Sequence, residues 1–221
     1  MINYNYLLEK LPGVTVIMID SGRSKKWIKE AQESVFNQVY PLKKTDNGNL
    51  NLQIELKVMI NHEKTNTIGY CWNKMIKEAK FDHIFILDDD DKIEHTLLFN
   101  LMLELQILKL DKKNKDIIGI TPYVTFLETK DGKPYRQFSN SYTSGLIEKE
   151  WLLKIPFRED LPRKVDMRWD DAIAKENKYV AIQRWNHGYI YRQHDQMVSG
   201  RNIDLKYIEK KLTEVVDIEV S

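Results

Sequence analysis

The sequence predicts an α/β fold with a mostly parallel, Rossmann-like central sheet flanked by helices. Apolar runs rich in β-branched residues recur at Val14–Ile19, Ile54–Ile60 and His83–Leu87. Segments whose apolar residues recur at helical spacing follow these runs. Strands that alternate with helices form parallel sheets, and such strands are buried on both faces, so they read as continuous apolar runs.

The first run, Val14–Ile19, is predicted to be a buried strand that ends at Asp20. Ser24 is placed as the N-cap of a helix that should end near Tyr40-Pro41. Strand, turn and helix form the first half of a βαβ unit. The polar stretch Lys43–Asn51 is expected to be a surface loop.

The second strand, Ile54–Ile60, precedes a loop and helix within Asn66–Ala79. The third strand, His83–Leu87, runs directly into four aspartates, Asp88–Asp91. A long helix with a leucine stripe follows, and Asp116–Val124 begins another strand. The remaining predicted elements are a hairpin over Phe126–Phe138 with its turn at Asp131-Gly132, helices at Glu148–Leu153, Trp169–Glu176 and Leu205–Val216, and strands at Tyr179–Ile182 and Gly188–Tyr191.

The composition fits one domain over residues 1–221. Hydrophobic residues make up 42% of the chain and charged residues 30%, so a packed core is expected. The net charge of +1 gives no bulk attraction to nucleic acid or anionic membrane. Cys71 is the single cysteine, which fits a reducing compartment. With no signal pattern and no long apolar run, we expect a soluble, cytoplasmic protein.

The aspartate cluster has two interpretations. Acidic residues favour the first turn of a helix, and a helix begins soon afterwards. Carboxylates are also the oxygen ligands that Mg²⁺ and Mn²⁺ prefer. Asp88 and Asp90 would face one ligand if the strand continued through them. The preceding strand favours the metal site, because ligands gather at the carboxyl ends of parallel strands.

Two later segments also carry candidate chemistry. Asp170 and Asp171 are either acids at a helix start or hold a general base for a sugar hydroxyl. His194 is either structural or part of a site with Arg192 and Arg201, whose cations suit a diphosphate.

At these places the chain resembles the family 2 inverting glycosyltransferases of GT-A fold. The resemblance covers the segment VTVIMIDSGRSKKWIKEAQESVFNQVYP, the segment GYCWN that ends at Asn73, the segment ILDDDD, and the segments WDDAIAKE and YRQH. These segments follow the family's order across most of residues 13 to 200. Where many family members have two aspartates and a glycine, this chain has Asn61-His62-Glu63, so the donor base stays open.

The resemblance implies a metal-dependent transfer of a sugar, with inversion, from a nucleotide-diphosphate sugar to a hydroxyl acceptor. A UDP-sugar is the expected donor and Mn²⁺ or Mg²⁺ the expected cofactor. It implies a nucleotide-sugar half at about 13–100, an acceptor half at about 101–200 and a C-terminal helix at 201–221. It assigns metal binding to Asp88, Asp90, Asp91 and His194, donor binding to Asp20, Arg23, Asn73, Asp88, Asp89 and Arg192, and catalysis to Asp171, the base, with Asp170 beside it.

The acceptor is expected to be a glycan, a protein or a hydroxymethylated DNA base, the last with little support because the chain is not basic. Two other classes stay open. A nucleotidyltransferase would use similar acids, but it usually has a glycine-rich phosphate loop, which Asp20-Ser21-Gly22-Arg23 does not resemble. A non-catalytic nucleotide-sugar-binding protein would bind the donor and tolerate the loss of Asp171.

Overall fold

The structure is a computed structural model that describes residues 8, 10–44, 50–128, 134–138, 145–161 and 165–192. His194, the predicted turn at Asp131-Gly132 and the predicted helix Leu205–Val216 lie outside the described residues. No helix in the described ranges is both long and apolar enough to cross a membrane.

The predicted parallel core of the sheet is confirmed. β1 (Val14–Asp20) lies between β4 (Ile54–Ile60) and β5 (His83–Ile86) and pairs with both in parallel. The side chains of β5 and of the first five residues of β1 are buried. This burial on both faces explains the continuous apolar runs.

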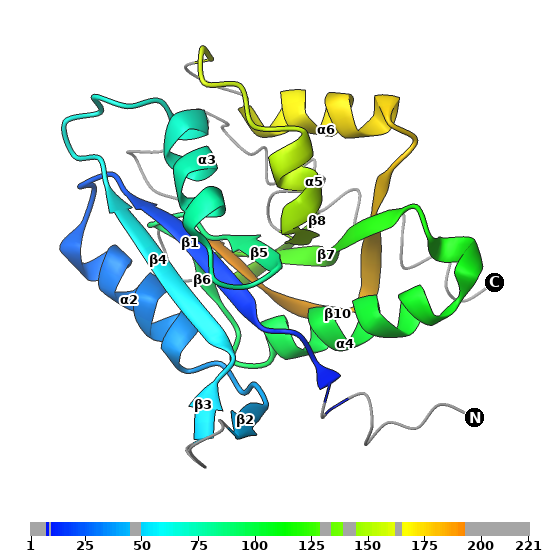
Figure 1. The fold of residues 1–221 in the computed structure, drawn as a ribbon. Coiled ribbons are helices and arrows are strands. Elements are labelled where there is room, and N and C mark those ends of the chain that lie inside the picture. Colours follow the sequence, from blue (N-terminus) through cyan, green and yellow to red (C-terminus); the bar gives the residue numbers. More distant parts are fainter. Residues whose placement is uncertain are drawn as a thin grey trace.

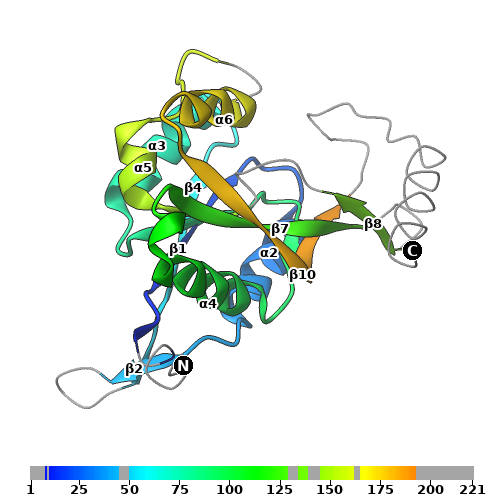
Figure 2. The same cartoon turned by 90° about the vertical axis from the view of Figure 1, so that its right-hand side faces the viewer.

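Helices cover both faces of the sheet (Figures 1 and 2). One hydrophobic core lies under α2 (Lys25–Phe36) and α4 (Leu97–Leu110). The other lies under α3 (Ile68–Glu78), α5 (Lys149–Lys154) and α6 (Val165–Lys175). Ser24 caps α2 as predicted, because its side chain accepts a hydrogen bond from the Trp27 backbone amide at 3.4 Å.

The remaining strands extend the same sheet in the order β4-β1-β5-β9-β7-β10-β6, with β8 paired to β7. They are β6 (Lys92–Ile93), β7 (Ile117–Glu128), β8 (Pro134–Phe138), β9 (Leu146–Glu148) and β10 (Tyr179–Arg192). β9 is antiparallel to both β5 and β7, while β7 and β10 are parallel. A short 3₁₀ helix, η1 (Lys112–Asn114), links α4 to β7.

These pairings bring the strand ends that carry candidate site residues to one edge of the sheet. β4, β1, β5, β7 and β10 all run in one direction, whereas β6, β8 and β9 run in the opposite one. The carboxyl ends of β4, β1, β5 and β10 therefore lie at the same edge of the sheet, where parallel α/β sheets bind their ligands.

Three expectations about elements are corrected. The ends of the predicted loop Lys43–Asn51 belong to a small antiparallel pair, β2 (Leu42–Lys44) and β3 (Leu50–Leu52). The two strands predicted at Tyr179–Ile182 and Gly188–Tyr191 are one strand, β10, whose register against β7 shifts between Gln183 and His187. This register shift interrupts the strand pattern in the sequence, so β10 looks like two strands although it is continuous.

The third correction concerns the acids of α6. The helix begins at Val165 rather than Trp169, so Asp170 and Asp171 lie beyond its first turn. The interpretation of this pair as charge complementarity at a helix start is therefore wrong, because that effect falls off within the first turn. The positions of Asp170 and Asp171 therefore need an explanation other than charge complementarity at a helix start.

Candidate active site

The aspartates that follow β5 form a turn rather than an extended strand. The Asp91 backbone amide donates to the Asp88 carbonyl at 3.2 Å. The expectation that Asp88 and Asp90 meet by alternation along a strand is therefore wrong, but the turn brings them together by another route. Carboxylate oxygens of Asp88, Asp90 and Asp91 all lie within 4.8 Å of one another.

Asp91 is held in this cluster from the end of β10. Tyr189 donates its hydroxyl to Asp91 Oδ2 at 2.8 Å, and the Arg192 backbone amide donates to Oδ1 at 2.9 Å. Burial raises the pKa of Asp91 well above its ordinary value, and the charges of Asp88 and Asp90 raise it further. Tyr189 received no role from the sequence, since this contact joins residues 98 positions apart.

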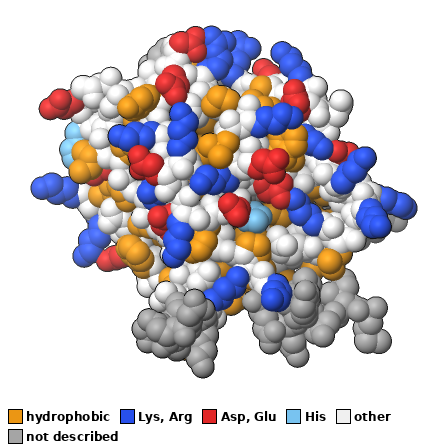
Figure 3. All heavy atoms as spheres, viewed as in Figure 1, with side chains coloured by type: hydrophobic (Ala, Val, Ile, Leu, Met, Phe, Trp, Pro, Cys, Tyr) orange, Lys and Arg blue, Asp and Glu red, His pale blue; other side chains and the backbone are white. Residues whose placement is uncertain are grey.

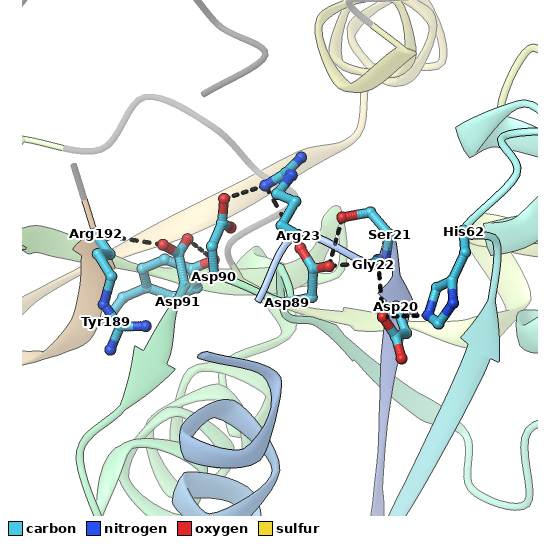
Figure 4. Close-up of polar contacts among 10 residues, drawn as sticks. All are labelled: Asp20, Ser21, Gly22, Arg23, His62, Asp89, Asp90, Asp91, Tyr189 and Arg192. Atoms are coloured by element: carbon cyan, nitrogen blue, oxygen red, sulfur yellow. Dashed lines mark hydrogen bonds and ion pairs between the residues drawn. The ribbon is translucent and has the colours of Figure 1, made fainter. Parts of the chain in front are cut away.

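The loop between β1 and α2 docks onto the same turn (Figure 4). Ser21 donates to Asp89 Oδ2 through its backbone amide at 2.8 Å and its hydroxyl at 2.6 Å. Arg23 Nη1 forms an ion pair with Asp90 and lies 3.5 Å from Asp89 Oδ1. Burial lowers the pKa of Arg23, but Asp90, Asp89 and Asp88 together raise it above its ordinary value, so the guanidinium stays charged.

Asp20, at the end of β1, organises the outer side of this loop. Its Oδ1 accepts the Gly22 backbone amide at 2.9 Å and lies 2.9 Å from His62 Nε2 (Figure 4). Gly22 has a φ of 74°, a conformation that favours glycine, and a Cβ there would also lie only 3.1 Å from the His62 ring, a tight contact. His62 had no assigned role, although its place just after β4 could have suggested one.

Asp88 is an exposed residue, unlike Asp90 and Asp91, but protein atoms surround its carboxyl group. The protein atoms around its carboxyl desolvate it, and this burial raises its pKa to about 7, with Asp90 as the next cause. Asp89 and Asp166 raise it further, while Arg23 lowers it. The turn therefore concentrates negative charge that a cation would relieve.

Asp166 brings α6 into electrostatic range of this turn. It raises the pKa of both Asp88 and Asp170, and Asp166 and Asp170 are one helical turn apart. Asp170 Oδ1 is buried and has no hydrogen-bond partner among the described residues. Burial, Asp166 and Asp171 raise the pKa of Asp170 to about 7. Asp166 was missed, although its spacing from Asp170 was visible in the sequence.

Asp171 lies in a different environment from Asp170. Its side chain is 66% exposed and lies 3.7 Å from the Arg168 guanidinium. The two neighbouring acids of α6 thus differ in their surroundings. The Asp170 carboxyl is desolvated, and its Oδ1 has no hydrogen-bond partner among the described residues. The Asp171 carboxyl is exposed and pairs with Arg168.

Two residues predicted to bind the donor make polar contacts within the protein. Asn73 donates to the Phe157 carbonyl at 2.8 Å and to Glu159 at 2.9 Å, and it accepts from the Phe157 amide at 2.9 Å. Arg192 donates to Glu30 at 2.5 Å, and its guanidinium lies 5.7 Å from the centre of the Trp27 ring. Its Nη1 is buried and has no partner among the described residues.

The cluster fits a divalent cation by the chemistry of its donors. Three carboxylates converge, and hard cations such as Mg²⁺ and Mn²⁺ take oxygen ligands, commonly one or two carboxylates with water and phosphate oxygens. Asp90 and Asp91 are buried, and the charges of Asp88 and Asp90 raise the pKa of Asp91, so a bound cation would relieve repulsion within the cluster.

No family model matches the chain. A sequence relative, the uncharacterized glycosyltransferase MJ1057 of Methanocaldococcus jannaschii, is 24% identical over 220 residues, an alignment that covers 85% of this chain and 74% of the relative. This relative supports the predicted enzyme class.

Solved structures of S. aureus TarS share the fold. The structure of TarS residues 1–349 in complex with UDP-GlcNAc has a TM-score of 0.60 at 18% identity and is matched over 86% of this chain and 62% of that one. A longer TarS structure has a TM-score of 0.59 at 16% identity, with 82% of this chain and 37% of that one covered. This chain thus spans less than two thirds of either TarS chain. The GT-A fold expected from the sequence is confirmed.

Proposed function

We propose that the protein is a metal-dependent glycosyltransferase that moves a sugar from a UDP-sugar to an acceptor hydroxyl with inversion. The observation that carries this proposal is the convergence of Asp88, Asp90 and Asp91 at the carboxyl edge of the sheet, next to the β1–α2 loop. The fold shared with TarS, which has been solved with UDP-GlcNAc, and the relative named a glycosyltransferase support it.

In this proposal Asp88, Asp90 and Asp91 hold Mn²⁺ or Mg²⁺, with His194 as the further ligand that the resemblance implies. The bound cation supplies positive charge against the diphosphate as it departs, which is typically a large catalytic effect. Tyr189 and the Arg192 backbone keep Asp91 in place from β10. Ser21 fixes the β1–α2 loop on Asp89, so the loop and the ligands form one unit.

The donor base would lie over the outer part of the β1–α2 loop, beside Asp20 and His62. Ile60, the last residue of β4, is 70% exposed there and offers an apolar contact to a planar base. Its strand partner across the sheet is Asp20, whose carboxylate bridges the Gly22 amide and His62. This arrangement replaces the acidic pair that the family commonly has after this strand.

The base that accepts the acceptor's proton lies in the pair Asp170-Asp171. The resemblance assigns the step to Asp171, but burial and charge favour Asp170. A general base works best when its pKa is near the working pH and one oxygen is available to the incoming hydroxyl. Asp170 meets the first condition with a pKa of about 7, and its Oδ1 has no partner among the described residues, so binding of the acceptor would need to expose this buried oxygen.

A donor-hydrolysis and transfer assay tests the function directly. The wild-type protein is incubated with UDP-GlcNAc and other UDP-sugars, with Mn²⁺ or with EDTA, and released UDP is measured. We expect metal-dependent release that Asp90→Asn reduces at least about 100-fold, the scale of losing a fixed charge at the reacting group. The matched control is Asp116→Asn, an acid paired with Lys178 near the start of β7. Binding of a UDP-sugar without any release would point to a non-catalytic binding protein instead.

A further inference from the structure

Arg23 places a positive charge inside the proposed metal site. Its Nη1 pairs with Asp90 and approaches Asp89, and its side chain is 23% exposed. Asp90 is one of the three carboxylates whose oxygens converge within 4.8 Å. The same carboxylate therefore serves the guanidinium and the expected cation.

The backbone that carries Arg23 is fixed, whereas its side chain is long. Ser21 is bound to Asp89 twice, and the Gly22 amide is bound to Asp20. A movement of the guanidinium therefore requires only side-chain rotation. An arginine also binds phosphate oxygens in the same two-pronged way in which it binds carboxylates, so a diphosphate is an equivalent partner for it.

Two cations compete for this carboxylate. A guanidinium bound to Asp90 Oδ2 occupies one oxygen of a carboxylate that a divalent ion would share, and two positive charges this close repel each other. A diphosphate next to the turn removes the conflict, because it offers Arg23 a new anion and offers the metal further oxygen ligands. Binding of one ligand then favours binding of the other, and such coupling is reciprocal.

We infer that Arg23 is a built-in counterion that leaves Asp90 for the donor's diphosphate, so that metal binds weakly until the nucleotide is present. The inference rests on the proposed function and adds to it a positioning residue that sets the order and cooperativity of binding. A permanent structural ion pair between Arg23 and Asp90 is the alternative.

Calorimetric titration of Mn²⁺ distinguishes a counterion that leaves Asp90 from a permanent ion pair between Arg23 and Asp90. The affinity for Mn²⁺ is measured without UDP and with saturating UDP for the wild type, Arg23→Gln and the control Lys29→Gln. Lys29 lies on α2, is 75% exposed and pairs with Glu33, so this control removes the same charge outside the cluster. We expect Arg23→Gln to bind Mn²⁺ about fivefold or more tightly without UDP, to bind UDP more weakly, and to show less coupling between the two ligands. Lys29→Gln should match the wild type.

Mn²⁺ affinity without UDP that is unchanged or lower in Arg23→Gln overturns the inference while leaving the proposed function intact. A wild type that binds no Mn²⁺ even with UDP overturns the proposed metal dependence, and the inference with it. If Arg23→Gln does not fold, the arginine side-chain NMR signals of the wild type give the answer. The Arg23 signal should change when Mg²⁺ and UDP are added together, and an unchanged signal contradicts the exchange.

Discussion

Asp170 and Asp171 are adjacent in the sequence but have opposite environments on α6. Asp170 is desolvated and carries a pKa of about 7, while Asp171 is exposed and pairs with Arg168. A carboxyl whose pKa is raised by folding contributes stability below its unfolded value of 3.8, and this contribution is lost as the pH rises through about 7. Asp170 therefore lowers the stability of the folded state at neutral pH, as expected for a residue with a catalytic role.

Asp170→Asn should accordingly raise stability while removing transfer. At pH 8 the expected gain in the free energy of unfolding is about 1–2 kcal/mol, a figure that already allows for solvent screening of this half-buried group. At pH 4 the gain should vanish. The measurement is urea unfolding at both pH values, together with the transfer assay.

Asp171→Asn is the matched control, and its stability should stay within about 0.5 kcal/mol of the wild type because it removes only an exposed ion pair. If Asp171→Asn abolishes transfer and Asp170→Asn keeps it, the base is Asp171, as the resemblance implies.

His83 gives the molecule a second, separable response to pH. Its side chain is buried on β5, and neither ring nitrogen has a partner among the described residues. Burial lowers its pKa to about 4, Lys109 lowers it further, and Asp82 raises it. The unfolded chain therefore takes up the proton first, and stability should fall as the pH drops from 6.5 toward 4.

The expected loss from His83 is up to about 3 kcal/mol over that interval, since each pKa unit is worth about 1.4 kcal/mol. His83→Gln should reduce this acid-sensitive slope, as measured by urea unfolding across the interval. His95→Gln, at an exposed position, should leave it unchanged. Equal slopes in the wild type and His83→Gln would contradict the assignment.

At the scale of single residues, the sequence drew attention to the acids of the candidate site but did not predict how they are arranged. The aspartate cluster and Asp170 were identified because acids after an apolar strand, or beside a tryptophan, are conspicuous. Tyr189 and His62 were missed because their contacts depend on strands that meet only in the folded sheet. The turn at Asp88–Asp91 was missed because its hydrogen bond is not encoded by any glycine or proline.

At the scale of elements, α3 is tied to the segment after α5 by Asn73. Its amide makes hydrogen bonds to both the amide and the carbonyl of Phe157, and Trp72 packs edge-on against the Phe157 ring at 4.9 Å between centroids. Glycine at position 69 lets the helix approach this segment, since a Cβ there would meet the Arg158 carbonyl at 2.3 Å. These contacts indicate a structural role for Asn73.

Asn73→Ala should therefore destabilise the fold, by about 2–4 kcal/mol, because it leaves two buried backbone groups of Phe157 unsatisfied. UDP affinity should stay within about twofold of the wild type. Chemical unfolding and UDP titration provide the two measurements. Lys74→Ala, on the exposed side of the same helix, should change stability by no more than about 0.5 kcal/mol. A large loss of UDP affinity at full stability would restore the donor-binding role that the resemblance implies.

Five Rossmann-like elements, β1, α2, β4, α3 and β5, were predictable because each carries its own local pattern. β1, β4 and β5 are continuous apolar runs, α2 begins at its predicted cap, Ser24, and α3 lies within the predicted segment Asn66–Ala79. The later elements depend on distant partners. β9 is only three residues long and fits between β5 and β7, and β10 spans an irregular register that looks like two strands in the sequence.

At the scale of the whole molecule, the charge is balanced and mixed. Lys and Arg side chains are interspersed with Asp and Glu over the face shown in Figure 3. Near the proposed acceptor side, α6 carries Asp166, Asp170 and Asp171. Proteins that act on duplex DNA neutralise phosphates with many Lys and Arg contacts, and the net charge of +1 gives this chain no bulk attraction to phosphates.

We therefore expect a neutral hydroxyl acceptor rather than DNA. In a gel-shift assay at about 50 mM salt, where phosphate contacts are strongest, duplex DNA with hydroxymethylated bases should show no retardation at micromolar protein. A salt-sensitive complex that is lost at about 200 mM salt would contradict this expectation and make modified DNA the acceptor to test first.

The proposed function depends on the turn Asp88–Asp91, which would hold a divalent cation against a nucleotide diphosphate. Its most direct test is a calorimetric titration of UDP into the wild type and into Asp90→Asn, each with Mn²⁺ and with EDTA. We predict that Mn²⁺ strengthens UDP binding at least about tenfold in the wild type and has little effect in Asp90→Asn. UDP binding that is equally strong in EDTA, or equally dependent on Mn²⁺ in both proteins, would contradict it.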